Sequence, residues 1–271
     1  MSNLRIAVAQ FEAGTDVARN REAVAQCITQ AAMVSDLVVL PENSMYFDPT
    51  KSKPGYRYSE GLDGQFVSSL SKAAREFQVH IVCGMTEANP EDTARPYNTL
   101  VYIDKQGELV DSYRKIHLYD AFGNRESDRV TPAKIGHPLV FDIGGVRVGA
   151  LTCYDLRFPE IFRWIADEDV DTIVLPAAWV AGSAKEFHWE TLLKARAIEN
   201  TVYIAGSGQT GPSCVGQSMI IDPMGVTLAS AGEEPGTIAS GIVSTDRIGS
   251  VRATNPSLNG RRFEVSPIDR L

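Results

Sequence analysis

The 271-residue sequence lacks the patterns that mark several common kinds of functional site. Its four cysteines are widely spaced with no Cys-x-x-Cys pair, which argues against a zinc site, a dithiol redox motif and a disulfide framework. The four histidines are equally scattered and show no metal-ligand spacing. The sequence contains neither a Gly-x-Ser-x-Gly nucleophile turn nor a Walker phosphate-binding loop. We therefore expect no metal site and no nucleotide site.

An excess of positive charge and a long apolar run are also missing. The net charge is −8, which provides no basic surface for nucleic acid and no cationic anchor for anionic membranes. No run approaches the roughly 18 apolar residues of a membrane span. The first residues lead into a short apolar strand rather than the long apolar segment of a signal peptide. We expect a cytoplasmic protein without nucleic-acid or membrane partners.

The composition and patterning that are present indicate a globular α/β protein. Apolar residues make up 44% of the chain and charged residues 22%, both ordinary values for a globular domain. Strands outnumber helices and both are spread along the chain, which predicts one domain over residues 1–271, with helices outside more than one sheet layer. The tail from Arg247 is polar and is expected to form an arm. The expected strands are 5–10, 37–40, 79–84, 98–104, 109–115, 139–143, 146–153, 172–175, 202–206, 218–222, 226–229 and 238–243, and the expected helices are 20–34, 66–77, one from about 157, and 187–200.

The stretch 146–160 is the strongest candidate for the site of chemistry. Its first half reads as a buried strand and its second half as the start of a helix, with Asp155 as an N-cap and Pro159 in the first turn. Cys153 then lies at the C-terminal end of a strand, where α/β sheets present side chains to ligands. A helix N-terminus would also favour its thiolate form. The alternative is a structural cysteine, since cysteine is often buried.

Two charged residues follow strands in the same way as Cys153. Glu42 comes after the strand 37–40, and Lys115 ends the strand 109–115. If the three strands are neighbours in one sheet, the three side chains meet at a common edge. A carboxylate there can act as general base for the thiol, while a lysine ammonium can hold an oxyanion and favour the thiolate. Taken singly, each charge is more simply a solvated surface group.

Three local strings resemble the signature segments of one enzyme family. Leu40-Pro41-Glu42, Tyr113-Arg114-Lys115-Ile116-His117-Leu118 and Leu151-Thr152-Cys153-Tyr154-Asp155-Leu156-Arg157-Phe158-Pro159-Glu160 closely resemble those of the nitrilase superfamily, the carbon–nitrogen hydrolases. The resemblance extends from Arg5 to the Arg261-Arg262-Phe263 tail, and residues 188–190 and 196–200 also look like this family. It implies a four-layer αββα sandwich that pairs into αββααββα dimers.

The resemblance also implies residue roles. Glu42 corresponds to the general base, Lys115 to the stabiliser of the oxyanion and Cys153 to the nucleophile. Glu126 matches a second glutamate beside the lysine, and the backbone N–H of Tyr154 would complete the oxyanion hole. Trp179 would lie in the substrate pocket, although a core aromatic residue is an equally good interpretation.

The string Cys-Tyr-Asp differs from the Cys-Trp-Glu that is usual in true nitrilases. It looks like the amidase branches, near the ω-amidases and deaminated-glutathione amidases. We therefore expect a cofactor-free amidase that forms a thioester on Cys153 and releases ammonia. A carbamoyl-amide hydrolase or nitrilase of the same superfamily, an inactive binding or scaffold relative, and a Cys–His hydrolase using His117 or His188 are the alternatives.

The expected substrate is a small amide whose far end carries a carboxylate, because the branches that the string resembles act on such molecules. The cations that could bind this carboxylate are Lys51, Lys53, Arg57, Arg125 and Lys185, all in loops. We also expect a homodimer or higher homo-oligomer. Its interface would contain the helices from about 157 and 187, because their apolar faces are wide for surface helices.

Overall fold

The computed structural model describes residues 2–49 and 58–268. The first half of the chain forms β1 (Asn3–Gln10), α1 (Val17–Ala32), β2 (Leu37–Val39), α2 (Gln65–Phe77), β3 (His80–Glu87), β4 (Tyr97–Ile103) and β5 (Leu109–Arg114). The second half forms β6 (Leu139–Ile143), β7 (Val146–Ala150), α3 (Pro159–Ala166), β8 (Thr172–Ala177), α4 (Lys185–Asn200), β9 (Tyr203–Gly208), β10 (Met219–Ile221), β11 (Thr227–Ser230), β12 (Thr237–Ser244) and α5 (Thr245–Thr254). Two short 3₁₀ helices, η1 (Glu126–Asp128) and η2 (Cys153–Arg157), lie in the connections.

The strands form two six-stranded sheets that are built in the same way. The first has the order β12-β1-β2-β3-β4-β5 and the second the order β11-β10-β9-β8-β7-β6. In each, three central strands run parallel, β1-β2-β3 and β7-β8-β9, and the outer strands pair antiparallel. Helices connect the parallel strands, as such crossovers require. Both sheets therefore direct the carboxyl ends of their parallel strands toward loops that can carry a site.

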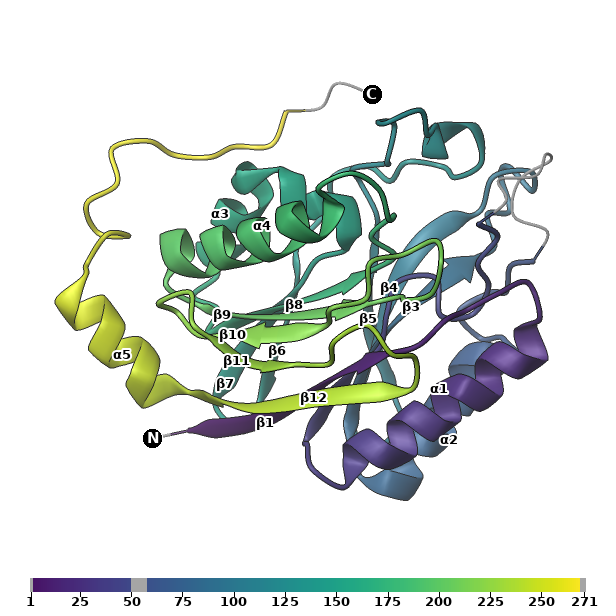
Figure 1. The fold of residues 1–271 in the computed structure, drawn as a ribbon, viewed down its shortest axis with the longest axis horizontal. Coiled ribbons are helices and arrows are strands. Elements are labelled where there is room, and N and C mark those ends of the chain that lie inside the picture. Colours follow the sequence, from purple (N-terminus) through teal and green to yellow (C-terminus); the bar gives the residue numbers. More distant parts are fainter. Residues whose placement is uncertain (1, 50–57, 269–271) are drawn as a thin grey trace.

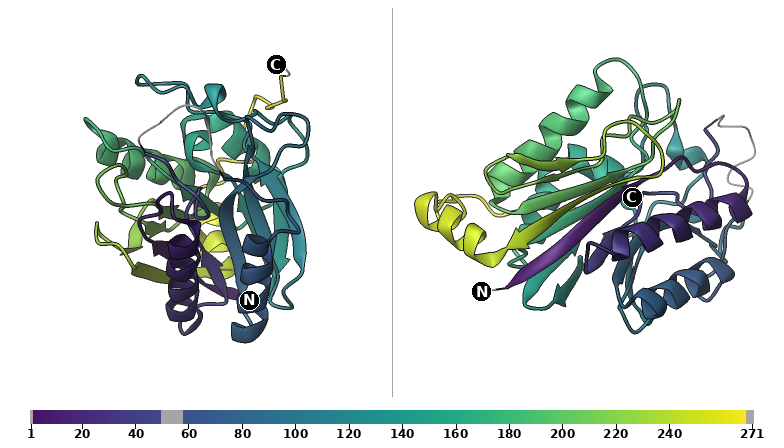
Figure 2. Two further views of the ribbon diagram at one scale, coloured as in Figure 1. Left: turned by 90° about the vertical axis from the view of Figure 1, so that its right-hand side faces the viewer. Right: turned by 60° about the horizontal axis from the view of Figure 1, so that its bottom comes forward.

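Helices cover the outer faces of the two sheets, giving the expected αββα sandwich. α1 and α2 lie against the first sheet, and α3 and α4 against the second (Figures 1 and 2). The stripe predicted for α1, which includes Cys27 and Ile28, is buried. The helix begins at Val17 rather than Asn20 because the Asp16 side chain accepts hydrogen bonds from the first N–H groups.

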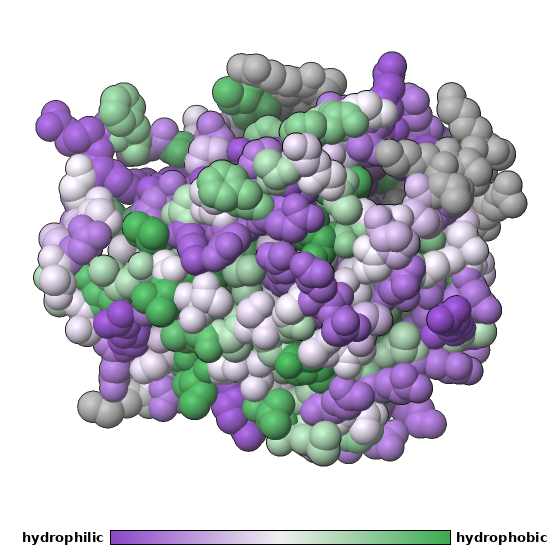
Figure 3. Space-filling model, in the orientation of Figure 1, coloured by the Kyte–Doolittle hydropathy of each residue, from purple (hydrophilic) through white to green (hydrophobic). Residues whose placement is uncertain are grey.

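The apolar face of α3 is not the exposed patch that the sequence suggested. Ile161, Phe162 and Ile165 are buried in the protein's own core, and Trp164 is only half-buried. On α4, Phe187 and Ile198 do remain exposed, by 68% and 49%. Over the face drawn in Figure 3, hydrophobic residues are scattered among hydrophilic ones. Among the described residues, no helix has both the length and the apolar character needed to cross a membrane.

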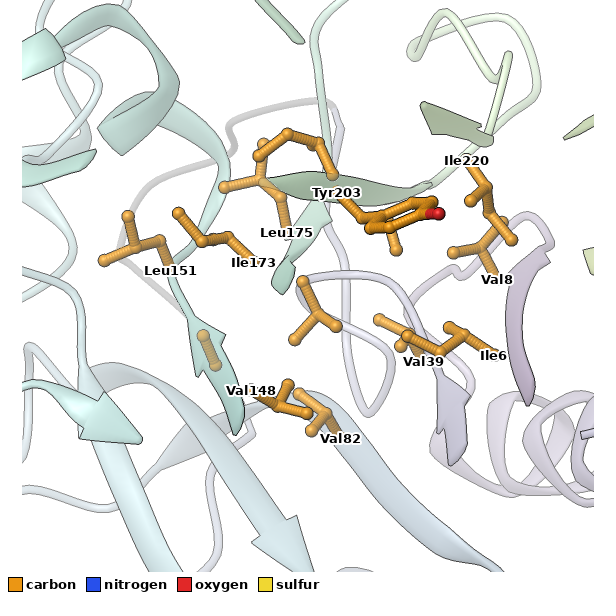
Figure 4. Packing of buried hydrophobic residues seen from close by; sticks show 14 of the residues in the cluster. Ile6, Val8, Val39, Val82, Val148, Leu151, Ile173, Leu175, Tyr203 and Ile220 are labelled. Carbon is orange, nitrogen blue, oxygen red and sulfur yellow. The ribbon is translucent and has the colours of Figure 1, made fainter. Parts of the chain in front are cut away.

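The main core fills the space between the two sheets. Its side chains come from both inner faces, as the labelled residues show: those of β1, β2 and β3 face those of β7, β8, β9 and β10 (Figure 4). Near the end of this layer, the Ser207 hydroxyl lies 2.7 Å from the carbonyl oxygen of Ala9 and 3.0 Å from that of Val39. These contacts tie β9 to β1 and β2 where the connecting loops begin.

Three local predictions were wrong. The strand expected over residues 146–153 ends at Ala150, and Cys153 instead begins the 3₁₀ helix η2. The tail from Arg247 begins inside a helix, α5, and becomes irregular only from Asn255 onward. Helix α5 buries only Ile248 and Val251. Its sequence therefore needs no continuous apolar stripe, and the pattern that marks most helices is missing. The strand expected to stop before Pro176 continues to Ala177. Proline is tolerated there because the pairing with β7 ends at Val174, so Pro176 has a partner strand, β9, on one side only.

Candidate active site

Glu42 is placed by a tight approach between the β2 loop and strand β3. The chain leaves β2 through Leu40 and Pro41, and the Gln209 side chain donates to the carbonyl oxygen of Glu42 at 3.0 Å. A Cβ atom on Gly84 would lie 2.5 Å from the Glu42 Cα atom. Glycine at position 84 therefore allows the glutamate to sit directly against the sheet.

Cys153 is the first residue of η2 and has a positive φ of 44°. A non-glycine residue in this region is uncommon and costs of order 1–3 kcal/mol. Asp155 is the third residue of this helix rather than its N-cap. Its carboxylate accepts a hydrogen bond of 3.0 Å from the backbone N–H of Thr152, which closes the turn around Cys153.

The three strand ends do not belong to neighbouring strands of one sheet, as the sequence suggested. β2 and β5 lie in the first sheet with β3 and β4 between them, whereas β7 belongs to the second sheet. Three strand spacings of about 4.8 Å separate β2 from β5, and only long side chains can bridge that distance. The site is therefore formed between the two sheets, with Cys153 contributed from across the core.

Lys115 lies at the centre of a buried charge cluster. Its ammonium nitrogen is 2.8 Å from Glu42 Oε1, and 2.9 Å and 3.2 Å from the two carboxylate oxygens of Glu126. Lys115 and Glu42 are each 2% exposed and Glu126 is 6% exposed. Buried charges of this kind require close pairing to be tolerated. Two carboxylates and one ammonium give the cluster a net charge of −1.

Two further groups hold the carboxylates, and the sequence did not suggest either. The Asn98 side-chain amide donates to Glu42 Oε1 at 2.7 Å and to Glu126 Oε1 at 3.2 Å. The backbone N–H of Ala178 donates to Glu42 Oε2 at 2.7 Å. Asn98 lies near the start of β4, whose later residues are apolar, and a polar amide in a predicted strand is the signal that could have singled it out.

The charges determine which groups are ionised. Burial raises the pKa of the Cys153 thiol well above its usual range, and the Glu42 carboxylate beside it raises this pKa further. Burial alone would raise the pKa of Glu42, but Lys115 and a hydrogen bond from Cys153 outweigh it, so the pKa is lowered. Burial would lower the pKa of Lys115, but Glu126 and Glu42 hold it well above its usual range.

The expected preference for thiolate is therefore wrong for this arrangement. Burial, and after it the Glu42 carboxylate, oppose an anion on Cys153, and Lys115 alone does not compensate. The arrangement instead pairs a neutral thiol with an ionised carboxylate. Such a pair can transfer a proton at the moment of attack.

The histidines that an alternative mechanism would use point elsewhere. His117 Nδ1 lies 2.7 Å from Asp155 Oδ1, and its ring stacks on Phe158 with centroids 3.9 Å apart. His188 Nδ1 lies 3.3 Å from Arg157 Nη2. The acid group within hydrogen-bonding reach of Cys153 is Glu42. Cys153 thus has a carboxylate partner.

A polar network connects the strand that carries Lys115 to the turn that carries Cys153. Tyr113 Oη donates to Asp155 Oδ2 at 2.9 Å, and His117 contacts the other oxygen of the same carboxylate. Both contacts come from residues 113–117, the segment that also carries Lys115. Asp155 is fully buried. It accepts hydrogen bonds from Tyr113, on β5 of the first sheet, and from Thr152, which follows β7 of the second sheet.

The charge cluster and Cys153 line a cavity of about 70 Å³ that opens to solvent. A second, much smaller cavity of about 10 Å³ adjoins it and shares Cys153, Tyr119, Ala178 and Val180 with the first. Tyr154 and Trp179 line this second part. Trp179 is 4% exposed, and its ring lies 5.6 Å from that of Trp189, so the residue belongs to both the core and the cavity wall.

The cations proposed for a substrate carboxylate are placed differently from one another. Lys51, Lys53 and Arg57 lie outside the described residues. Arg125 is exposed and pairs with Asp128 at 3.6 Å. Lys185 lines the second cavity, together with Arg157, which the sequence interpretation had not singled out.

Comparisons with known proteins, by sequence and by structure, agree with one another. Residues 5–253 match the family model described as carbon-nitrogen hydrolase. A deaminated glutathione amidase of Escherichia coli O157:H7 is 39% identical over 259 residues, which cover 95% of this chain and 97% of that protein.

Two solved structures resemble the present one along nearly its whole length. The NitFhit protein of C. elegans aligns with a TM-score of 0.86 and 26% identity, covering 99% of this chain and 69% of that one. A CN-hydrolase superfamily protein from Xanthomonas campestris aligns with a TM-score of 0.85 and 28% identity, covering 98% of this chain and 100% of that one.

Proposed function

Because the chain belongs to the carbon–nitrogen hydrolase family, we propose that it is an amidase that cleaves a small, non-peptide amide through a thioester on Cys153. In this proposal Glu42 is the general base, Lys115 stabilises the oxyanion and Glu126 fixes Lys115. The protein acts in the cytoplasm, as one domain, without cofactor or metal, and as a homodimer or larger homo-oligomer.

One observation carries the proposal: the contact of Lys115 with both Glu42 and Glu126 at the wall of a cavity that Cys153 also lines. A structural ion pair would need one carboxylate for one ammonium. Here a second carboxylate and an Asn98 amide surround the pair, while burial raises the pKa of the neighbouring Cys153 thiol. This arrangement supports a group that accepts a proton from Cys153 and later returns it.

The first half of the reaction forms the thioester. Glu42 accepts the thiol proton as Cys153 Sγ attacks the amide carbonyl carbon, and the carbonyl oxygen becomes an oxyanion. The Lys115 ammonium and the backbone N–H of Tyr154 stabilise it. Tyr154 is the second residue of η2, and the first N–H groups of a helix have no partner within it. Glu42 then gives its proton to the nitrogen, the C–N bond breaks, and ammonia leaves when the amide is primary.

The second half releases the acid. Water enters the position that the amine has left, and Glu42 removes one of its protons as the oxygen attacks the thioester carbon. The oxyanion forms again beside Lys115. When it collapses, the C–S bond breaks and Glu42 returns the proton to the Cys153 thiolate. The free carboxylic acid departs and the site regains its starting charges.

The substrate that we propose carries a carboxylate at its far end. The sequence string around Cys153 and the relative named deaminated glutathione amidase support this choice. A carbamoyl amide or a nitrile would meet the same nucleophile and base and is the second candidate within the family. An inactive binding relative is disfavoured, because Glu42, Lys115 and Cys153 are all present and meet in one cavity.

A substrate panel tests the proposal. Purified protein is incubated with ω-amides of dicarboxylic acids, deaminated glutathione, N-carbamoyl amino acids and aliphatic nitriles, and the acid product and released amine are both measured. We expect turnover of at least one amide and none by Cys153→Ala, which lacks the nucleophile. Turnover of nitriles alone would replace the amidase proposal. No turnover of any compound, with binding retained, would favour the scaffold alternative.

A further inference from the structure

The Asn98 side chain contacts both carboxylates of the charge cluster, yet the proposed reaction gives it no task. Its amide nitrogen lies 2.7 Å from Glu42 Oε1 and 3.2 Å from Glu126 Oε1. The Lys115 ammonium contacts the same two oxygen atoms, at 2.8 Å and 3.2 Å. Because the two Oε1 atoms share both donors, they lie close to each other.

Two carboxylates placed in this way would ordinarily share a proton. Like charges at one site favour protonation of one partner, and burial adds to this tendency because it disfavours both charges. Glu42 and Glu126 are both buried, and they share the single ammonium of Lys115. A proton held between the two Oε1 atoms would occupy Glu42 and prevent it from accepting the proton of Cys153.

Each of the four carboxylate oxygens instead accepts a hydrogen bond from nitrogen. Glu42 Oε2 accepts from the backbone N–H of Ala178 at 2.7 Å. Glu126 Oε2 accepts from Lys115 at 2.9 Å and from the backbone N–H of Tyr119 at 2.6 Å. Hydrogen bonds of this kind favour the ionised form of a carboxyl group. The three contacts of Lys115 with carboxylate oxygens use all three hydrogens of its ammonium.

Lys115 cannot keep all three contacts during the proposed reaction. When it donates to the oxyanion, one of its hydrogens must leave a carboxylate oxygen. The Asn98 amide carries two hydrogens and contacts both Oε1 atoms, so it still covers them at that moment. As a neutral donor, it does so without adding a positive charge that would weaken the base.

The orientation of the Asn98 amide supports a role beyond packing. Its oxygen atom, Oδ1, is buried and has no hydrogen-bond partner among the residues that the structure describes. An unpaired buried acceptor is destabilising, and an apolar side chain of similar shape would avoid that cost. The reversed amide would direct Oδ1 at two carboxylates. The N–H groups can therefore face the pair only while the oxygen stays unpaired.

We propose that Asn98 is a positioning residue that prevents Glu42 and Glu126 from sharing a proton, so that Glu42 stays free to accept the proton of Cys153. The inference rests on the proposed function, because it takes Glu42 as the general base. The other charged and titratable groups around the pair are Lys115 after β5, Cys153 in η2, and Tyr119, Arg129 and Cys214 in loops. All of them stay in place when Asn98 is substituted.

The acidic limb of the pH profile, the range over which kcat/KM declines as the pH falls, tests the role of the amide. Asn98→Leu keeps a similar shape but removes the donor, and the smaller Asn98→Ala repeats the test if the leucine variant does not fold. We expect the limb to move upward by about one pH unit or more, because a hydrogen bond to a charged group is worth at least that much. Asn98→Asp, which adds a third acid, should move it further. Above the shifted limb, kcat/KM should return to the order of magnitude of the wild type.

Thr99→Val is the matched control. Thr99 is the next residue of β4 and is fully buried, and its hydroxyl donates to Glu87 Oε2 at 2.7 Å. Successive residues of a strand face opposite sides of the sheet, so this bond lies on the face away from Asn98. Thr99→Val removes a comparable buried hydrogen bond and should leave the limb in place.

Three kinetic outcomes would overturn the inference. A loss of kcat/KM by the same factor at every pH in Asn98→Leu would show a structural role only. The same limb shift in Thr99→Val would show that it does not report the amide. A shift in Asn98→Asp alone would report the added charge rather than the lost donor.

Titration of the free protein separates this inference from the proposed reaction. Protein labelled with ¹³C at the glutamate carboxyl carbons is followed by NMR without substrate, and Glu42→Gln and Glu126→Gln assign the two signals. We expect the pair in Asn98→Leu to take up a proton about one pH unit or more above the wild-type pair. Proton uptake at an unchanged pH would overturn the inference. The expected uptake in a protein that hydrolyses no amide would support the exclusion of the proton by Asn98 and refute the proposed function.

Discussion

At the scale of single residues, the site is organised by a net negative charge. Two glutamates surround one lysine, and burial together with the neighbouring Glu42 carboxylate raises the pKa of the Cys153 thiol well above its usual range. An enzyme that began from a thiolate would need the reverse balance. Glu42 is therefore able to act as a base at neutral pH, because its own pKa lies below the usual value of 4.5.

The pH dependence of the reaction follows from these shifts. Because the pKa of Glu42 is lowered, the carboxylate remains ionised as the pH falls, until the pH passes below the ordinary range of glutamate, about 4.3. We predict that kcat/KM stays nearly constant from pH 7 to about 5 and declines only below that. The kcat/KM profile reports groups of the free enzyme, and circular dichroism at each pH checks folding. A decline centred between 6 and 7 would instead indicate a histidine and revive the Cys–His alternative.

Asp155 positions the nucleophile without touching the reacting atoms. It accepts bonds from Thr152 and Tyr113 and contacts His117, so it joins the Cys153 turn to the end of β5. We predict that Asp155→Asn lowers kcat about 10²-fold with a smaller change in KM, because slight misplacement of a nucleophile is costly. Tyr113→Phe, which removes one hydrogen bond to the same carboxylate, should lose far less. Equal effects of the two variants would contradict the positioning role.

At the scale of elements, the local pattern of apolar and polar residues predicted most strands and helices. It also singled out Glu42, Lys115 and Cys153, which lie at or shortly after the ends of strands. Lys115 could be recognised because it comes directly after the alternating strand β5, and Cys153 because it comes shortly after the apolar strand β7, which ends at Ala150. Pairing between strands could not be predicted, since β2 and β5 are separated by two others and β7 lies in the second sheet. The same limit hid Asn98, whose role depends on neighbours that are distant in the sequence.

Helix α5 escaped prediction for a different reason. It buries only two residues and contains Gly249, which has poor helix propensity. We predict that Gly249→Ala raises the free energy of unfolding by about 0.5–1 kcal/mol, because nothing lies within 4 Å of the added Cβ atom.

Gly149 on β7 provides the matched comparison. There the same substitution would bring the Cβ atom to 2.8 Å from Ile165 Cδ1, so it should destabilise by about 1–3 kcal/mol. Urea denaturation of both variants measures the two effects. A change of the same sign in both would show that the packing described for α3 and α5 is wrong.

At the scale of the whole molecule, α4 presents the surface through which we expect self-association. The exposed apolar face predicted for α3 is absent, but Phe187 and Ile198 remain exposed on α4. Contact there would also support α3, which follows the Cys153 turn. We predict a dimer at micromolar concentration by sedimentation velocity, and at least tenfold weaker association for Phe187→Asp. Met33→Asp, at an equally exposed position after α1, is the control. A fully active wild-type monomer at these concentrations would refute the expectation.

The identity of the nucleophile is the central claim, and one measurement addresses it directly. The protein is mixed with an excess of a slowly hydrolysed amide, quenched in acid within the first turnover, and analysed by intact mass and peptide mapping. The account predicts a single added acyl group on Cys153, absent from Cys153→Ala and accumulating more slowly in Glu42→Gln, by the roughly 10²–10⁴-fold typical of a lost general base. An acyl group on Cys27, Cys83 or Cys214, or turnover by Cys153→Ala at the wild-type rate, would contradict it.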